Sequence, residues 1–225
     1  LALPLLPKVA HRLAARRLVL RLEIANRPGM FAKVVALIAQ HGCSLGAIDL
    51  VEASPSLYVR DVTVDAPDPT TGELLAADLR AVITTMRISH ELERTADLVV
   101  NVAKATKRIY PHTLDPKVRG IIDQMGRQAT NQTRLALDAY ADTDPSWARA
   151  LADMDDAMDE LTKSLFRHSL SVGANADEGT IVKAMQIALL ARHYERIADH
   201  AVTIAERVQF MVTGQHPGQD EHERD

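Results

Sequence analysis

Two pairs of carboxylates in the C-terminal half of the sequence have a spacing that suits cation binding. Asp155 precedes Asp159 by four residues, and Glu195 precedes Asp199 by the same interval. Four residues make about one helical turn, so the two side chains of a pair lie on the same strip of a helix. Like charges one turn apart destabilise a helix slightly. Two such pairs on facing helices would therefore be compensated by a hard cation, for which carboxylate oxygens are suitable ligands.

A third pair, Glu93 and Asp97, belongs to an internal repeat. The segment Glu91-Leu-Glu-Arg-Thr-Ala-Asp97 returns as His193-Tyr-Glu-Arg-Ile-Ala-Asp199, 102 residues further along the chain. Repetition of a helical segment predicts two copies of one unit, each burying its apolar face against the other.

The spacing also has a simpler interpretation. On the second copy, Tyr194, Ile197 and Ala201 lie opposite the acidic strip, and an acidic stripe opposite an apolar one is typical of a solvated helix face. Asp155 and Asp159 differ because they border an apolar seam, so they could face a neighbouring helix. His193 and His200 flank the second motif and could join a metal site or lie in the core.

The carboxylates lie in a part of the sequence that is helical throughout. Proline and glycine residues punctuate four long predicted helices, at about residues 73–110, 115–141, 144–170 and 177–213. The third has apolar residues in steps of three and four, which predict a seam packed in a helical bundle: Trp147, Leu151, Met154, Met158, Leu161 and Leu165. The polar residues 214–225 are predicted to form a disordered tail.

The segment before the helices has a different pattern. Alternating and β-branched residues predict strands around Leu18–Ile24, 47–51 and 59–64. The turn Asn26-Arg27-Pro28-Gly29-Met30 starts a helix between the first two strands. The chain is thus predicted to be α+β: a βαββ module at 17–70, followed by a bundle of four long antiparallel helices at 73–213.

Composition limits the classes of function. A formal net charge of −4 provides no basic surface for nucleic acid. The single cysteine, Cys43, cannot form an internal disulfide, so a reducing, cytoplasmic setting is expected. No G-x-S-x-G elbow, Walker loop or repeated Glu-x-x-His pair indicates hydrolase, nucleotide or di-iron chemistry, so the chain is predicted not to be an enzyme.

The repeated Glu-Arg-x-Ala-Asp motif, with Ala77-Asp-Leu-Arg80 ahead of it, resembles the PhoU family over about residues 75–213. The resemblance implies two three-helix repeats, a role in regulating phosphate uptake, and a phosphate ABC transporter and a sensor histidine kinase as partners. It also implies a divalent or iron-type metal ion, held by Asp155, Asp159, Glu195 and Asp199, with Glu93 and Asp97 as the first repeat's equivalent. The first two helices of the family pattern are missing, and Lys104 stands where the second copy has Glu206. We therefore expect one complete cluster at most.

The N-terminal module resembles an ACT domain, especially the one that precedes some bacterial malic enzymes. Three segments carry the likeness: Arg21-Leu-Glu-Ile-Ala-Asn-Arg-Pro-Gly-Met30, Gly46-Ala-Ile-Asp49 and Val59-Arg-Asp-Val-Thr-Val64. ACT modules bind amino acids or other small effectors at a paired interface, which implies a homodimer and a ligand site at Asn26, Pro28, Gly29 and Met30. A small-effector sensor or dimerisation protein is therefore the alternative to a phosphate regulator. No fourth strand follows, and a natural fusion and an artificial chimera both remain open.

Overall fold

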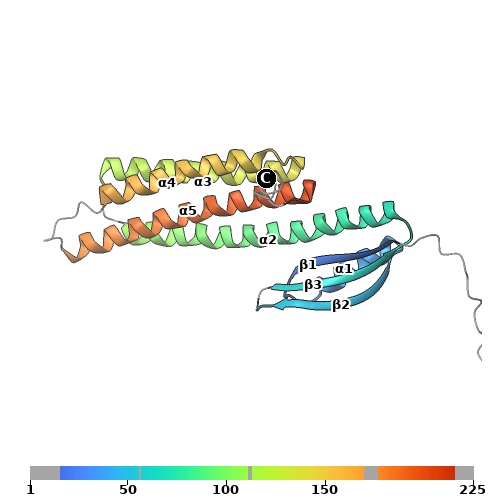
Figure 1. Ribbon diagram of the computed structural model, residues 1–225. Coiled ribbons are helices and arrows are strands. Elements are labelled where there is room, and N and C mark those ends of the chain that lie inside the picture. Colours follow the sequence, from blue (N-terminus) through green and yellow to red (C-terminus); the bar gives the residue numbers. More distant parts are fainter. Residues whose placement is uncertain (1–15, 56, 111–112, 170–176, 216–225) are drawn as a thin grey trace, which may run out of the picture. The chain divides into compact units, whose positions relative to one another are not determined.

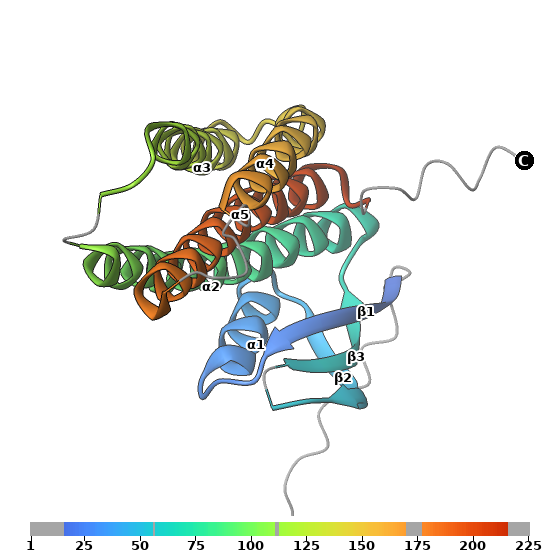
Figure 2. The ribbon, with the colours of Figure 1, turned by 90° about the vertical axis from the view of Figure 1, so that its left-hand side faces the viewer.

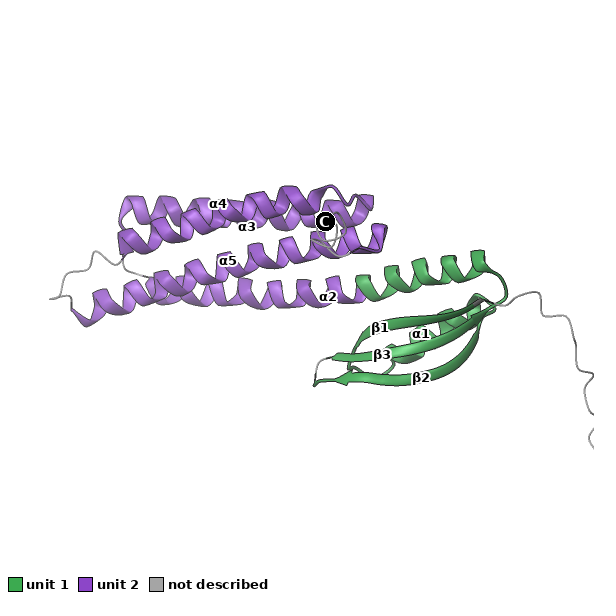
Figure 3. Cartoon of the chain, viewed as in Figure 1, with its two compact units in different colours: residues 1–85 green, residues 86–225 purple. Residues whose placement is uncertain are grey.

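The structure, a computed structural model, describes residues 16–55, 57–110, 113–169 and 177–215 and contains three strands and five helices in that part of the chain (Figure 1). The chain divides into two compact units, residues 1–85 and 86–225 (Figure 3). The long helix α2 (Pro69–Ile109) contributes to both, because the division falls between Thr85 and Met86. No described helix combines the length and apolarity needed to cross a membrane.

The first unit is a three-stranded antiparallel sheet with helices on one face. Strands β1 (Arg16–Ala25), β3 (Leu57–Ala66) and β2 (Ser44–Ala53) lie in the order β1-β3-β2. Helix α1 (Met30–Gln40) lies on one face of the sheet (Figure 2). Alternate residues of β1 and β3 pack there with α1 and the start of α2. The buried residues of this core include Leu22, Ile24, Val34, Ile38, Val62, Val64, Leu75 and Leu79.

Charged residues pair across β1 and β3 on the other face of the sheet. Arg21 donates two hydrogen bonds to Asp61, both 2.8 Å long. Arg17 donates one of 2.9 Å to Asp65, and both pairs are directly opposite in the strand register. The alternation predicted from the sequence is therefore present, with an apolar face toward the helices and a charged face away from them.

The helix α2 begins earlier than the sequence suggested. The helix is preceded by Asp68, whose side chain accepts a 2.8 Å hydrogen bond from the amide of Thr71. Pro69 occupies the first helical position, where its missing N–H costs nothing. The opening turns of α2 then pack on the sheet through Leu75 and Leu79. This packing is why the compact units differ from the predicted segments 17–70 and 73–213.

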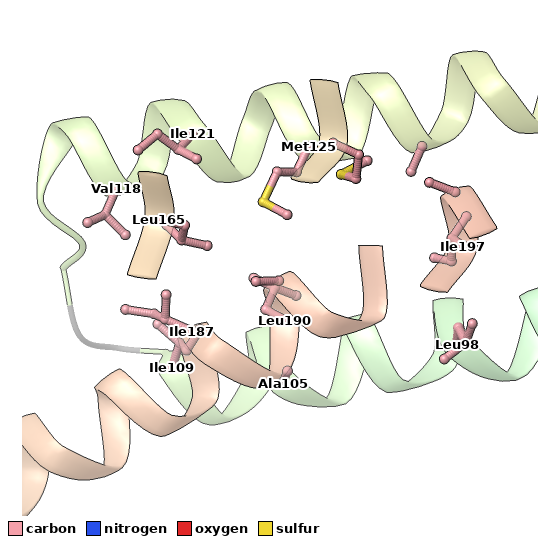
Figure 4. Packing of buried hydrophobic residues seen from close by; sticks show 14 residues of the cluster. Leu98, Ala105, Ile109, Val118, Ile121, Met125, Leu165, Ile187, Leu190 and Ile197 are labelled. Carbon is pink, nitrogen blue, oxygen red and sulfur yellow. The ribbon is translucent and has the colours of Figure 1, made fainter. Parts of the chain in front are cut away.

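The second unit contains the rest of α2 with α3 (Pro116–Asp142), α4 (Trp147–Ser169) and α5 (Glu178–Thr213). One core cluster joins the C-terminal end of α2 to the start of α3, the end of α4 and the first half of α5 (Figure 4). Another joins Ile88 of α2 to Ala136, Leu151 and Ile204 at the opposite end. Successive helices therefore run antiparallel, as predicted.

The apolar seam predicted on α4 is part of this core. Leu151, Met158 and Leu165 are almost fully buried, and Trp147, Met154 and Leu161 pack against the clusters. Gly214, with φ of 74°, ends α5 in a left-handed C-cap. The predicted tail lies outside the described residues from 216 onward.

Candidate functional site

The packing of α4 on α5 brings four predicted carboxylates to one surface patch. We call Asp155, Asp159, Glu195 and Asp199 the acidic patch. Burial, followed by the charges of Asp199, Asp159 and Glu195, raises the pKa of Asp155 to about 6. Burial and Glu195 likewise raise the pKa of Asp199. Carboxylates on two helices therefore repel one another across the α4–α5 contact.

The surroundings of the patch explain why Asp155 is affected most. Asp155 is half-buried at the edge of the α4 seam, between Leu151 and Met158, whereas Asp159 is exposed one turn later. A partly buried carboxylate is poorly hydrated, so nearby negative charges act on it more strongly. The sequence indicated this position through its place beside the seam.

One cation of the chain already lies within the acidic patch. Arg192, one turn before Glu195 on α5, forms an ion pair and a hydrogen bond with the Glu195 carboxylate. Its charge also lowers the pKa of Asp199, against the effect of burial. Arg192 thus offsets part of the negative charge of the patch, a role that the sequence did not reveal.

The acidic patch has the type of ligand that a hard cation prefers, but its side chains are not arranged to hold one. Four carboxylates from two helices are the oxygen donors that such a cation prefers. Yet across the described parts of the chain, no three His, Cys, Asp or Glu side chains are arranged so that they could hold one metal ion. A bound cation would have to draw the carboxylates together and compete with Arg192 for Glu195.

The third predicted pair has a different environment. Glu93 and Asp97 lie on an exposed side of α2, and neither contributes to the shifted pKa of Asp155 or Asp199. His90 lies one turn before Glu93, with 3.6 Å between its Nδ1 and the carboxylate. The structure therefore brings together four of the six carboxylates named from the sequence.

A buried ionic cluster between α2 and α5 was missed by sequence reasoning. The Glu91 and His200 side chains are only 7% and 8% exposed, and the His200 Nδ1 lies 2.8 Å from Glu91 Oε2. Arg207 donates a 3.2 Å hydrogen bond to the other Glu91 oxygen. Burial lowers the pKa of His200. Of the two alternatives that the sequence left open for His200, the structure favours the core position, because its ring faces Glu91 there.

The turn predicted to bind a small effector, Asn26 to Met30, leads into a helix as expected. Gly29 precedes α1 with φ of 81°, a left-handed conformation that favours glycine. Asn26 donates a 3.2 Å hydrogen bond to the carbonyl of Ser54, which ties the turn to the β2–β3 connection. Met30 packs against the core of the first unit. A ligand at Asn26, Pro28, Gly29 and Met30, and the ACT-like assignment itself, stay predictions.

Residues 122–208 match the PhoU domain. The matched segment runs from α3 to α5 and contains all four residues of the acidic patch, whereas Glu93 and Asp97 lie outside it.

Relatives and solved structures agree with the PhoU match. The phosphate-specific transport system accessory protein PhoU homolog 1 of Mycobacterium leprae is 37% identical over 147 residues, or 65% of each chain. A PhoU homolog of Zymomonas mobilis is 39% identical over 62% of this chain and 58% of its own length. The crystal structure of PhoU from Pseudomonas aeruginosa superposes with a TM-score of 0.57 and 30% identity, over 62% of this chain and 66% of that one.

The helical part of the chain is therefore similar to PhoU proteins. The chain spans less than two thirds of the length of the M. leprae and Z. mobilis relatives. The roles of those complete proteins therefore enter only as proposals.

Proposed function

We propose that this chain is a non-enzymatic regulator of phosphate uptake and of phosphate-responsive signalling. The observation that carries the proposal is the PhoU match over 122–208, which falls on the helices that form the acidic patch. The similar proteins of M. leprae and Z. mobilis are named as accessory proteins of phosphate-specific transport systems. A regulator of this kind acts by binding, so its partners are the phosphate ABC transporter and a sensor histidine kinase, from the cytoplasmic side.

The acidic patch is the surface that we propose for this binding. Its charges are concentrated on two adjacent helices, and the charged form of Asp155 is disfavoured by burial and then by its acidic neighbours. A basic partner surface or a cation would relieve that repulsion. Complementary charge would also speed the encounter with a basic partner and make the association sensitive to salt.

Co-purification tests the regulatory role. The chain is tagged and expressed in a bacterium that contains the phosphate transporter, and the transporter's ATP-binding subunit and the sensor kinase are quantified in the eluate. The double variant Asp155→Asn, Asp199→Asn is expected to recover several-fold less of both partners. The matched control, Glu93→Gln with Asp97→Asn, removes the same charge from α2. Failure of the unaltered chain to retain either partner would contradict the proposed role.

We further propose that the acidic patch takes up a divalent or iron-type metal ion. The proposal is supported by the donor chemistry and by the raised pKa values of Asp155 and Asp199. Elemental analysis of the purified protein beside an Asp155→Ala, Asp199→Ala variant tests it. We expect metal in the first and a clear loss in the second. Equal metal content in the two proteins would remove the metal site and leave the adaptor role untouched.

The alternative role as a small-effector sensor depends on the first unit. It is supported by the left-handed Gly29 at the start of α1 and by the nearby Asn26. Thermal shift measurements with amino acids and organic acids test this role. A ligand that raises the melting temperature of the unaltered chain, but not that of Asn26→Ala, would favour the sensor. No shift with any of these compounds would count against it.

A further inference from the structure

The part of α2 within the helical bundle has one buried seam and one exposed strip opposite to it. The seam faces the core in steps of three and four residues, and its members are Ile88, Glu91, Thr95, Leu98, Val102, Ala105 and Ile109. At about 100° per residue, the positions furthest from this seam form a single line along the helix. We call this line the α2 strip, and it consists of Glu93, Asp97, Val100, Lys104 and Lys107.

The α2 strip is apolar in the middle and charged at its ends. Val100 is 51% exposed, and the neighbouring Val99 is 54% exposed. Ala96 and Ala103, which flank Val100, are exposed as well. Acidic residues lie toward the N-terminal end of the strip, and lysines lie toward the C-terminal end.

The repeat shows that these residue types belong to a packing surface. Ala198, Ala201 and Ala205 of α5 occupy the positions equivalent to Ala96, Val99 and Ala103, and they are at most 1% exposed. Helices α3 and α4 cover that face of α5. On α2, the same face is left open by the helices that the structure describes. The first copy of the repeat thus has a packing face without its packing partner.

We propose that a second copy of this chain covers the α2 strip with its own α2, in antiparallel orientation about a twofold axis near Val100. In this arrangement Asp97 faces the second copy's Lys104, and Glu93 faces the second copy's Lys107. Each pair occurs twice because a twofold interface is self-complementary. A parallel arrangement would instead place acidic residues against acidic ones, which electrostatics disfavours.

The size of the central residues suits close contact of two helices. Val100 meets its own symmetry mate at the axis, with Ala96 and Ala103 on either side. Small side chains at the crossing point allow helix axes to approach to about 8 Å. The inference rests on the repeat and on charge complementarity, so it is independent of the regulatory role proposed above.

Charge reversal followed by restoration tests the proposal. Sedimentation velocity of the full chain over a range of concentrations at about 0.1 M salt gives the dimer dissociation constant. We expect Asp97→Lys and Lys104→Asp each to weaken the dimer by about tenfold or more, because two repulsive contacts replace two attractive ones. The double variant Asp97→Lys, Lys104→Asp restores the pairs and is expected to return to within about threefold of the unaltered chain.

Two further variants distinguish dimerisation through this surface from nonspecific association. Val100→Glu is expected to weaken the dimer by about tenfold or more, since it places a charge at the axis. Val182→Glu is the matched control, because Val182 is a similarly exposed valine on α5. Circular dichroism confirms that each variant is folded.

Cross-linking provides an independent readout. A Val100→Cys chain, with Cys43 replaced by serine, is expected to form a disulfide-linked dimer on mild oxidation, whereas Val182→Cys is not. An unaltered chain that stays monomeric at about 100 µM would overturn the proposal, because specific dimers associate well below that concentration. A dimer that Asp97→Lys and Val100→Glu both leave intact would overturn it equally.

Discussion

The two copies of the repeat carry nearly the same residues in different surroundings. In α5, Glu195 and Asp199 face the acidic pair of α4, and the alanines beside them are buried. In α2, Glu93 and Asp97 lie on an exposed strip, and the equivalent alanines are exposed. The motif therefore specifies which side chains share a helical strip, whereas the neighbouring helix decides whether they become an acidic patch or a solvated surface.

The largest expected difference between the copies concerns Glu91 and its equivalent, His193. Glu91→Ala removes the buried acid that pairs with His200 and Arg207, and breaking a buried ionic cluster costs about 3 kcal/mol. His193 is only partly buried, so His193→Ala is expected to cost less than about 1 kcal/mol. Urea unfolding followed by circular dichroism measures both. Similar losses in the two variants would contradict the distinction drawn between the copies.

A smaller difference is expected for a pair of equivalent alanines. Ala205 is 1% exposed within the core, whereas Ala103 is exposed on α2. Ala205→Leu overfills the core and is expected to lower the free energy of unfolding by about 2 kcal/mol. Ala103→Leu is expected to change it by less than about 0.5 kcal/mol. Both are measured at low protein concentration, so that self-association does not contribute; a large loss in Ala103→Leu would show that the face is covered within one chain.

The smallest expected effect is that of charge in the acidic patch. The pKa of Asp155 is raised to about 6 in the folded chain, so the folded state holds this proton more tightly than the unfolded state does. The resulting stability is present below about pH 4 and is lost as the pH rises through 6. Asp155→Asn is therefore expected to raise the free energy of unfolding at pH 7 by about 1 kcal/mol, with partial exposure taken into account.

The pH profile of the Asp155→Asn effect distinguishes this cause from others. In the presence of a chelator, the gain is expected to fade as the pH falls from 6 to 4. Asp97→Asn serves as the control, with a change of less than about 0.5 kcal/mol at every pH. A gain that persists unchanged at pH 4 would mean that repulsion within the patch is not its source.

Local features of this molecule could be predicted from sequence, whereas contacts distant along the chain could not. The alternation of Leu20, Leu22 and Ile24 predicted β1, and the spacing of the α4 seam predicted the burial of Leu151 and Met158. Both are properties of a single element. The position of Asp155 beside that seam was enough to suggest that it faces another helix.

The buried pairing of Glu91 escaped prediction for a physical reason. Its partner Arg207 is 116 residues away along the chain, and nothing in the spacing of either residue indicates the other. The sequence contains one indication: Glu91 lies between Ile88 and Thr95, at a position of α2 whose spacing predicts a buried residue. A charged residue on a buried seam requires a partner, but the spacing within that seam does not indicate which helix supplies the partner.

The most direct test of the central claim is a phosphate-responsive reporter in a bacterial strain that lacks its own PhoU. We predict that the unaltered chain and the Glu93→Gln, Asp97→Asn variant both restore repression of the reporter at high phosphate. The Asp155→Asn, Asp199→Asn variant, present at the same level, is predicted not to restore it. Equal repression by the two double variants would contradict the assignment of function to the acidic patch, and no repression by the unaltered chain would contradict the regulatory role itself.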